Sequence, residues 1–386
     1  MRILSIQTYL RSERINPRAG GKSRISLMLA RYLLESGHEV ALYPWPERIW
    51  GKTADFAASP DVSASVFPTL AIPPVLHIVP NAFRLSTTRF YGNEHRSLFE
   101  DMCFLEGLKL AISRFRPDIL HCHQTESDIP PLLRILGKSM PVILTHHSGR
   151  SGHHLDVYDR IIFLSRIMQE EVCRRSGFPV GKSRVLYCPI SGEFLQGDVI
   201  PARDRHGLVC VGGLKDAKGV DVLLEAFRQN ERLRSQPLHL CGTGPDEVRY
   251  KEFAARHNLP VVFHGRISTE EVKSIVSRAG LLVNPSRMEG FSVALLEALA
   301  CGTPVVGWAD QVNELEQAWH RSVGFAFDAR RQGADELAAL IDRAQNDPVG
   351  RDESRRALSR QARESFSIER YGMEMVKLYT DLRKGG

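Results

Sequence analysis

Two glutamates eight positions apart, Glu289 and Glu297, carry side chains suited to binding hydroxyl groups, because an ionised carboxylate accepts hydroxyl hydrogen bonds well. The apolar run 281–283 predicts a buried strand that stops at the turn signal Asn284-Pro285. A helix is expected to begin near Ser292. This pattern places Glu289 in a loop at the carboxyl end of a strand and Glu297 in the second turn of the next helix. In open α/β sheets, ligands bind at that edge.

The start of this expected helix also predicts an anion site. The N–H groups of residues 290–294 would have no partner within the helix, and the helix dipole favours an anion such as a diphosphate. One loop and one helix would then bind both halves of a nucleotide sugar. The alternative is that both glutamates are solvated surface charges. The apolar neighbours of Glu297 argue against it, because a carboxylate there is rarely buried without a partner.

The segment from Glu289 to Val306 resembles the Glu-x7-Glu signature of the retaining GT-B glycosyltransferases of family four, the glycosyl transferases group 1. Other parts of the chain resemble the same family, and more specifically in its second half: Gly20-Gly21, Gly37 to Val40, Pro117 to His123, Val211 to Leu214, Lys218 to Asp221, Gly242 to Pro245 and Phe263 to Gly265. The resemblance implies an α/β protein of the GT-B class, with two Rossmann-like domains facing each other across a cleft.

The resemblance also implies roles for individual residues. It assigns Glu297 to the ribose hydroxyls and Glu289 to hydroxyls of the transferred sugar. Further donor contacts would come from the backbone: Gly290, Phe291, Ser292 and Val293 for the sugar and diphosphate, Arg266 and Ile267 for the edge of the base, and Gly20 and Gly21 for close approach to the diphosphate.

Lys218 is the expected phosphate cation, although a lysine in such a loop can also be simply exposed. The family usually pairs this lysine with an arginine just after a glycine. Here that position is Gly213, so one phosphate charge loses its usual partner. Lys215 or Arg266 could compensate.

The histidines have two interpretations. His121 and His123 would share one face of a strand, yet no cysteine or carboxylate set completes a zinc pattern, so no metal is expected. Thr145-His146-His147-Ser148 resembles a family loop in which a histidine reaches the donor sugar. By alignment this is His147, with His146 as the second choice and a structural histidine as the alternative.

The implied enzyme is a hexosyltransferase of glycan biosynthesis. It would move a hexose from a UDP- or GDP-sugar to an acceptor hydroxyl with retention, by front-face attack in which the leaving diphosphate takes the acceptor proton. Lys218 and the helix amides would stabilise that diphosphate without a metal or cofactor. Two alternatives stay open: a nucleotide-sugar 2-epimerase and a non-catalytic nucleotide-sugar-binding subunit.

Composition fits a globular protein of two domains. The chain has 386 residues, 43% hydrophobic, with no apolar run long enough to span a membrane and too short an apolar start for a signal peptide. Seven scattered cysteines indicate reduced thiols and a cytoplasmic protein.

The net charge of +6 comes with no nucleic-acid module, so no nucleic-acid partner is expected. Basic residues between 11 and 24 fit a solvated surface, or attraction of an anionic donor or a membrane-bound acceptor. Peripheral contact with the inner membrane surface therefore stays open, as does a glycan, lipid-linked or small-molecule acceptor.

Strand and helix patterns alternate along the chain, which predicts parallel βαβ units. We expect an N-terminal domain over 1–188, a linker over 189–206, a second domain over 207–365 and a C-terminal helix over 366–386. The family resemblance implies that the first domain binds the acceptor, that the second binds the nucleotide sugar, and that the last helix packs back on the first domain. Local signals mark several elements: strands at 3–6, 40–43, 118–122, 142–145, 161–164 and 208–211, helices at 23–34 and 95–115, an N-cap at Ser165 for a helix ending near Gly177, and a capping box at 268–271. Residues 44–92 follow no clear pattern.

Overall fold

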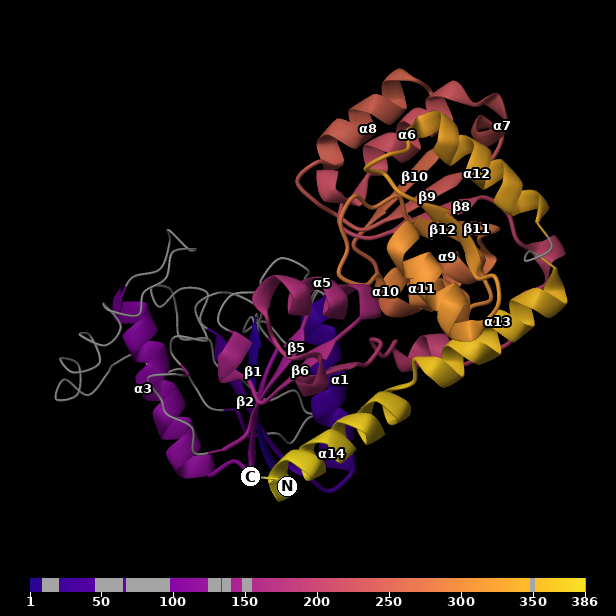
Figure 1. Ribbon diagram of the computed structural model, residues 1–386. Helices are drawn as coiled ribbons and strands as arrows, with labels where there is room; N and C mark the ends of the chain where they lie inside the picture. The colour runs from indigo at the N-terminus through magenta and orange to yellow at the C-terminus, as the bar shows by residue number, and fades with distance from the viewer. Residues whose placement is uncertain are drawn as a thin grey trace. The chain divides into compact units, whose positions relative to one another are not determined.

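The computed structural model describes residues 1–8, 21–45, 65–66, 98–123, 133, 140–147, 155–347 and 351–385. The chain divides into two compact units (Figure 1). Unit 1 combines Met1–Tyr187 with Ile368–Gly386, and unit 2 is the continuous segment Cys188–Ser367. Each unit is built on its own parallel sheet.

The sheet of unit 1 has seven strands in the order β3-β2-β1-β4-β5-β6-β7. Its strands are β1 (Arg2–Thr8), β2 (Glu39–Trp45), β3 (Ser65–Val66), β4 (Ile119–Cys122), β5 (Val142–His146), β6 (Arg160–Phe163) and β7 (Ser183–Val185). Its helices are α1 (Gly21–Glu35), α3 (Leu98–Phe115), α5 (Arg166–Ser176) and α14 (Ile368–Gly385), with 3-10 turns η2 (Leu155–Val157) and η3 (Val180–Lys182). Helices therefore occur between strands as the alternating pattern predicts.

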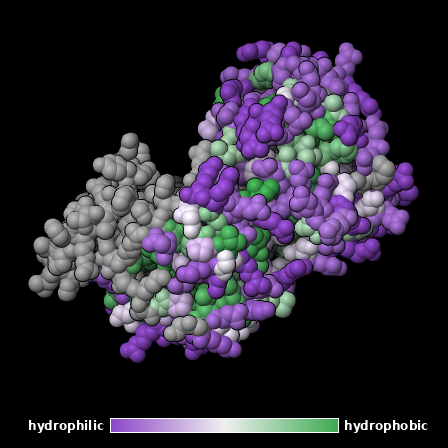
Figure 2. Space-filling model, viewed as in Figure 1, coloured by the Kyte–Doolittle hydropathy of each residue, from purple (hydrophilic) through white to green (hydrophobic). Residues whose placement is uncertain are grey.

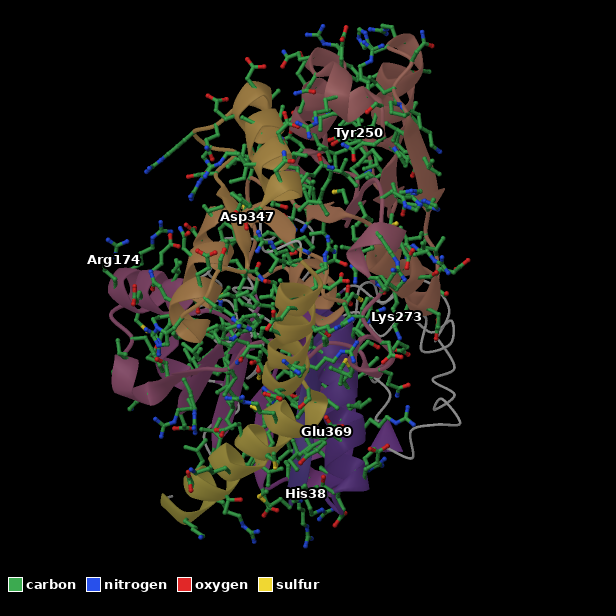
Figure 3. All side chains as sticks on the ribbon, turned by 90° about the vertical axis from the view of Figure 1, so that its right-hand side faces the viewer. His38, Arg174, Tyr250, Lys273, Asp347 and Glu369 are labelled. Carbon is green, nitrogen blue, oxygen red and sulfur yellow. The ribbon has the colours of Figure 1, made fainter. Side chains whose placement is uncertain are left out.

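Side-chain alternation along the strands gives unit 1 two separate cores. Ile3 of β1 packs in a cluster with residues of α1 and α14, whereas Leu4 packs with residues of α3. Helix α14, whose start is marked by Glu369 in Figure 3, contacts α1. The unit is therefore a three-layer α/β/α arrangement in which α14 completes one layer, although it comes from the far end of the chain.

The sheet of unit 2 has six strands in the order β10-β9-β8-β11-β12-β13. Its strands are β8 (Leu208–Val211), β9 (Leu238–Cys241), β10 (Val261–Gly265), β11 (Leu281–Val283), β12 (Val305–Trp308) and β13 (Gly324–Phe327). Its helices are α6 (Val220–Gln229), α7 (Glu231–Arg234), α8 (Glu247–Arg256), α9 (Thr269–Arg278), α10 (Val293–Ala300), α11 (Ala309–Trp319), α12 (Ala334–Asn346) and α13 (Asp352–Ser365).

Helices cover both faces of this second sheet. One core cluster joins the sheet to α6, α8 and α12 and includes Tyr250, labelled in Figure 3, which is 2% exposed. On the other side, α10 contacts β12 and α13. The outer surface over α6, α7 and α8 is mainly hydrophilic (Figure 2), as expected for helix faces turned to solvent.

Local sequence signals set several helix ends. The Ser165 hydroxyl accepts the Met168 N–H at 3.1 Å, and Gly177 ends α5 with a φ of 72°. Ser268 and Glu271 form the predicted capping box of α9, at 3.2 and 2.8 Å. These caps are confirmed because each depends on residues within one turn of the helix end.

The strand order fixes where unit 2 can bind a ligand. From the central strand β8 the chain moves outward through β9 to β10, then returns to β11 on the other side of β8. The direction of winding therefore reverses between β8 and β11. In such sheets the crevice beyond the carboxyl ends of these two strands is the usual ligand site. The residues that follow β8 and β11 are those singled out from the sequence.

The segment expected as a linker holds two short 3-10 turns, η4 (Gly192–Leu195) and η5 (Ala202–Asp204), and lies in unit 2. A further 3-10 turn, η6 (Asp216–Lys218), precedes α6. Among the described residues, no helix combines the length and the apolar character needed to cross a membrane.

Candidate active site

The loops after β8 and β11 bring Lys218 and Glu289 into direct contact. Lys218 closes the turn η6, and its ammonium donates a hydrogen bond to the Glu289 carboxylate. The Ser286 hydroxyl donates to the same carboxylate oxygen at 2.9 Å. The side chains of Lys218 and Glu289 are 24% and 9% exposed, so this ion pair is largely shielded from water. The structure therefore unites the two residues expected to serve the diphosphate and the sugar.

A glycine lets the two loops approach closely. Gly219 has a φ of 65°, and a Cβ added there would lie 2.0 Å from the carbonyl oxygen of Pro285. Any side chain at this position would therefore displace one loop from the other and would also strain the backbone.

The start of α10 is held by a buried glutamine on the next helix. Gln311 accepts the Ser292 N–H at 2.7 Å and donates to the Ser292 carbonyl at 3.0 Å. Asn284 donates to the Ser292 hydroxyl at 2.7 Å. The Ser292 amide, expected to face the donor, is thus already engaged. The later amides of the first turn, beginning with Val293, are the helix N–H groups that lack a partner within the helix.

Glu297 lies in the second turn of α10, as predicted, and is 5% exposed. Leu295, Leu296 and Ala298 beside it are fully buried. A solvated surface glutamate would not be covered in this way, so the surface-charge interpretation of Glu297 is wrong. Phe291, at the entry to the helix, is 7% exposed.

The opposite end of α10 is neutralised by arginines. Arg205 donates to the Cys301 carbonyl at 2.7 Å, Arg363 donates to the Ala300 carbonyl at 3.1 Å, and Arg355 donates to the Gly302 carbonyl at 3.4 Å. Positive charge at a helix C-terminus complements the helix dipole and satisfies carbonyls that lack helical partners. The helix that carries Glu297 is therefore anchored at both ends.

Gly213 has room for a Cβ atom. A Cβ at this position would meet only the Thr243 carbonyl, at 3.7 Å, and its φ lies outside the left-handed region. The backbone therefore does not demand glycine here. The side chains of Lys215 and Arg266, the two residues expected to compensate, are both exposed.

A small pocket at this point has room for little more than a water molecule, and its walls include Val211, Gly212, Gly213, Lys218 and Ser286. Cys210 also lines it. Burial raises the pKa of the Cys210 thiol to about 12, so this cysteine is a neutral thiol and not a nucleophilic thiolate. The charged residue in the pocket wall is Lys218, which pairs with Glu289.

In unit 1, histidines gather at the carboxyl ends of β4 and β5. The rings of His121 and His123 lie 4.0 Å apart, on one face as predicted, and the ring of His147 lies 5.9 Å from that of His123. His146 instead contacts the ring of Phe163 at 5.3 Å, in the core on the other face. This arrangement favours His147 over His146 as the histidine that belongs to a site at the sheet edge.

Hydrogen bonds hold His121 from two sides. Its ring nitrogens lie 2.8 Å from the Thr145 hydroxyl and 2.7 Å from the Tyr379 hydroxyl of α14. Burial lowers the pKa of His121 well below its usual value and lowers that of His123 to about 3, so both rings are neutral at pH 7. Within the part of the chain that the structure describes, no group of three or more His, Cys, Asp or Glu could hold a metal.

Comparison with known proteins identifies the family. The model for "Glycosyltransferase Family 4" matches residues 19–194, and the model for "Glycosyl transferases group 1" matches residues 199–365. The chain belongs to the group 1 glycosyltransferases. It is therefore an enzyme that transfers a sugar from a nucleotide sugar.

Relatives and solved structures agree with this assignment. A glycosyltransferase of Methanocaldococcus jannaschii is 25% identical over 68% of this chain and 75% of its own length, and a second one from the same organism is 24% identical over 60% and 64%. The glycogen synthase of Mycobacterium tuberculosis is 24% identical over 72% of both chains. Sucrose-phosphate synthase of Thermosynechococcus elongatus has the same GT-B fold, with a TM-score of 0.73 at 20% identity over 100% of both chains. Anabaena HepE, solved with UDP-glucose, matches with a TM-score of 0.70 at 14% identity over 99% of this chain and 100% of its own.

The structure of this glycosyltransferase places most of the predicted site residues. Gly213, Lys218, Glu289 and Glu297 lie in unit 2 in the loops after β8 and β11 and on α10, with Arg266 and Ile267 after β10. His147 follows β5 and Gly21 begins α1, both in unit 1, whereas Gly20 lies outside the described residues.

Three residues of the glycosyltransferase site were not found from the sequence. Gln311 gives no signal, because its partner Ser292 is on another helix. Arg287 and Asp221 form an ion pair between the two loops, and they lie two and three positions from the predicted site residues Glu289 and Lys218. Their opposite charges gave a signal that they could pair, but nothing in the sequence says that the two loops meet.

Proposed function

We propose that the chain is a retaining hexosyltransferase that uses a UDP- or GDP-sugar and needs neither metal nor cofactor. The observation that carries the proposal is the contact between Lys218 and Glu289 at the point where the second sheet reverses its winding. A cation for a diphosphate and a carboxylate for a sugar meet beside the helix that presents Glu297. These are the groups that a nucleotide sugar requires.

In this proposal each side chain binds one part of the donor. Glu297, buried in the second turn of α10, accepts the ribose hydroxyls. The amides of the first turn of α10, from Val293 onward, and the Lys218 ammonium hold the diphosphate. Glu289 accepts hydroxyls of the hexose, with its second partner Ser286 fixing one carboxylate oxygen. The backbone at Arg266 and Ile267 meets the base.

The transfer step is front-face displacement. The bond between the anomeric carbon and the diphosphate oxygen breaks, and the acceptor oxygen bonds to the same face of that carbon. The acceptor proton passes to the leaving diphosphate oxygen, so the configuration is retained. Lys218 and the helix dipole stabilise the negative charge that grows on the diphosphate. From the family resemblance, His147 is the histidine proposed to hydrogen-bond the donor sugar.

A thermal-shift panel of nucleotide sugars tests the proposal first. A bound donor raises the unfolding midpoint by mass action. The panel begins with UDP-glucose, because HepE was solved with that ligand, and includes GDP-mannose, UDP-galactose and UDP-N-acetylglucosamine. The stabilising donor is then incubated with sugar and lipid-linked acceptors in excess EDTA, and the product anomer is determined by NMR.

We expect an α-linked product from an α-linked donor, with turnover in EDTA. An inverted product would exclude the retaining mechanism. Turnover that stops in EDTA and returns with a divalent ion would refute metal independence. Conversion of donor to an epimer without acceptor would instead identify the epimerase alternative.

A further inference from the structure

Arg287 forms several hydrogen bonds with the turn that carries Lys218 and with the helix that follows it. Its guanidinium donates to the Asp216 carbonyl at 2.6 Å and to both carboxylate oxygens of Asp221, at 2.8 and 2.6 Å. Its backbone N–H donates to the Ala217 carbonyl at 3.0 Å. Asp216 and Ala217 belong to η6, the turn that ends at Lys218, and Asp221 is in the first turn of α6. One residue therefore bonds to both sides of Lys218.

Arg287 also lies two positions before Glu289 in the same loop. The two loops are thus joined at two places. Lys218 pairs with Glu289, and Arg287, in the loop of Glu289, bonds to η6 and Asp221, which lie on either side of Lys218. The distance between Lys218 and Glu289 therefore depends on the bond between Arg287 and Asp221 that also joins the loops. The approach of Gly219 to Pro285 sets how close the loops come, and Arg287 sets how they are turned relative to each other.

The Arg287–Asp221 ion pair is better suited to positioning other groups than to stabilising the fold. The side chains of Arg287 and Asp221 are 29% and 38% exposed. Ion pairs with this exposure contribute little to global stability. A planar guanidinium bound by both nitrogens to one carboxylate nevertheless fixes direction as well as distance. Burial by itself would raise the pKa of the Asp221 carboxyl, but the hydrogen bond and the charge of Arg287 help to bring this pKa below its usual value. The pair is therefore charged at neutral pH.

We propose that Arg287, through Asp221 and η6, is a positioning residue that holds the Lys218 ammonium where charge grows on the leaving diphosphate. The inference rests on the proposed function. It assigns to Arg287 no contact with the donor itself. Its effect is therefore expected on the chemical step and on the phosphate nearest that step, and not on binding of the nucleoside.

The chain provides a matched control pair. On α6, the helix that carries Asp221, Arg228 donates to both carboxylate oxygens of Glu225, at 2.8 and 2.6 Å. These side chains are 40% and 32% exposed, close to the values for Arg287 and Asp221. The Arg228–Glu225 pair does not touch either loop of the site. Arg228→Lys therefore reports what the loss of such a bidentate pair does by itself.

The experiment compares Arg287→Lys, Asp221→Asn, the double variant and Arg228→Lys with the wild type. Three quantities are measured: kcat, the thermal midpoint, and the Kd for the nucleoside diphosphate and monophosphate of the donor that the wild type uses. We expect Arg287→Lys to lower kcat about ten- to hundredfold, because small misplacements of a catalytic group cost that much. The Kd should rise for the diphosphate and stay unchanged for the monophosphate. Arg228→Lys should change the midpoint to a similar extent and leave kcat within twofold.

The double variant gives the sharpest evidence. If Arg287 and Asp221 act through one bond, their combined loss in kcat equals the larger single loss. Losses that multiply would overturn the inference, as would an Arg287→Lys enzyme with wild-type kcat. A wild type that neither binds a nucleoside diphosphate nor transfers sugar would instead refute the proposed function. If Asp221→Asn does not fold, the comparison of Arg287→Lys with Arg228→Lys still decides the question.

Discussion

The ammonium of Lys218 and the carboxylate of Glu289 form an ion pair although they are 71 positions apart in the chain. The cation expected for the diphosphate is thus paired with the carboxylate expected for the sugar. A donor that brings its own negative charge has to share or displace this partner. Removing the charge of one member should therefore change how the other binds.

Glu289→Gln should lower kcat strongly while binding of the free nucleoside diphosphate is retained or becomes tighter. Contacts to the transferred sugar tighten as it gains oxocarbenium character, so their loss appears in kcat. The amide no longer neutralises Lys218, which leaves more positive charge for the diphosphate. Calorimetry with the nucleoside diphosphate, beside steady-state kinetics, measures both effects.

Glu297→Gln should behave in the opposite way. Its ribose contacts are remote from the bond that breaks and are similar in the ground and transition states. We expect a higher KM for the donor and weaker nucleoside diphosphate binding, with a smaller change in kcat. If Glu297→Gln leaves binding untouched and Glu289→Gln abolishes it, the assignment of the two carboxylates is wrong.

Lys218→Ala should lower kcat by roughly a hundredfold or more, equivalent to about 3 kcal/mol, because it removes a stabiliser of developing charge. Nucleotide binding should weaken much less. Lys215→Ala is the matched control, a lysine three positions earlier with an exposed side chain. A large loss of turnover in Lys215→Ala with little in Lys218→Ala would show that Lys215 is the true phosphate cation.

Gly213→Arg should tighten binding of the nucleoside diphosphate. A Cβ is tolerated there, because it would meet only the Thr243 carbonyl, at 3.7 Å. The new guanidinium would supply the second phosphate cation that relatives of this family usually have. Calorimetry should show a Kd several-fold lower than that of the wild type. Gly213→Leu controls for bulk without charge, and equal affinity gains in both variants would argue against an electrostatic cause.

Stability should fall as the pH is lowered from 6.5 to 5. Burial lowers the pKa of His123 to about 3, below the value of about 6.5 in the unfolded chain. Between these two pKa values the unfolded state binds a proton that the folded state does not. The contribution of neutral His123 to the free energy of unfolding is therefore complete above pH 6.5 and is lost towards pH 3. From pH 6.5 to 5 this one histidine accounts for about 1.5 kcal/mol.

Urea titrations at both pH values measure this difference in the free energy of unfolding. His123→Gln should reduce the pH dependence, whereas His206→Gln, at an exposed position, should keep it. Equal pH dependence in the wild type and His123→Gln would contradict the buried, neutral state of His123.

Sequence reasoning succeeded where the determining residues are close in the chain. The Ser165 cap, the Ser268 capping box and the position of Glu297 each follow from neighbours within a few positions. It could not predict contacts between distant segments. The Tyr379 hydroxyl reaches His121 across 258 positions, and Arg205 reaches Thr303 across 98. Such partners depend on how the sheets are wound, which no local pattern encodes.

The path of α14 has a practical consequence for dividing the enzyme into parts. The chain passes from one unit to the other after Tyr187 and again after Ser367. A gene for unit 2 therefore needs only one continuous reading frame, Cys188–Ser367. A gene that stops at Tyr187 would encode unit 1 without Tyr379 and without the apolar face of α14 that covers its sheet. An intact unit 1 has to be made by joining Ile368–Gly386 to Tyr187 through a new linker, or by supplying this helix as a separate peptide.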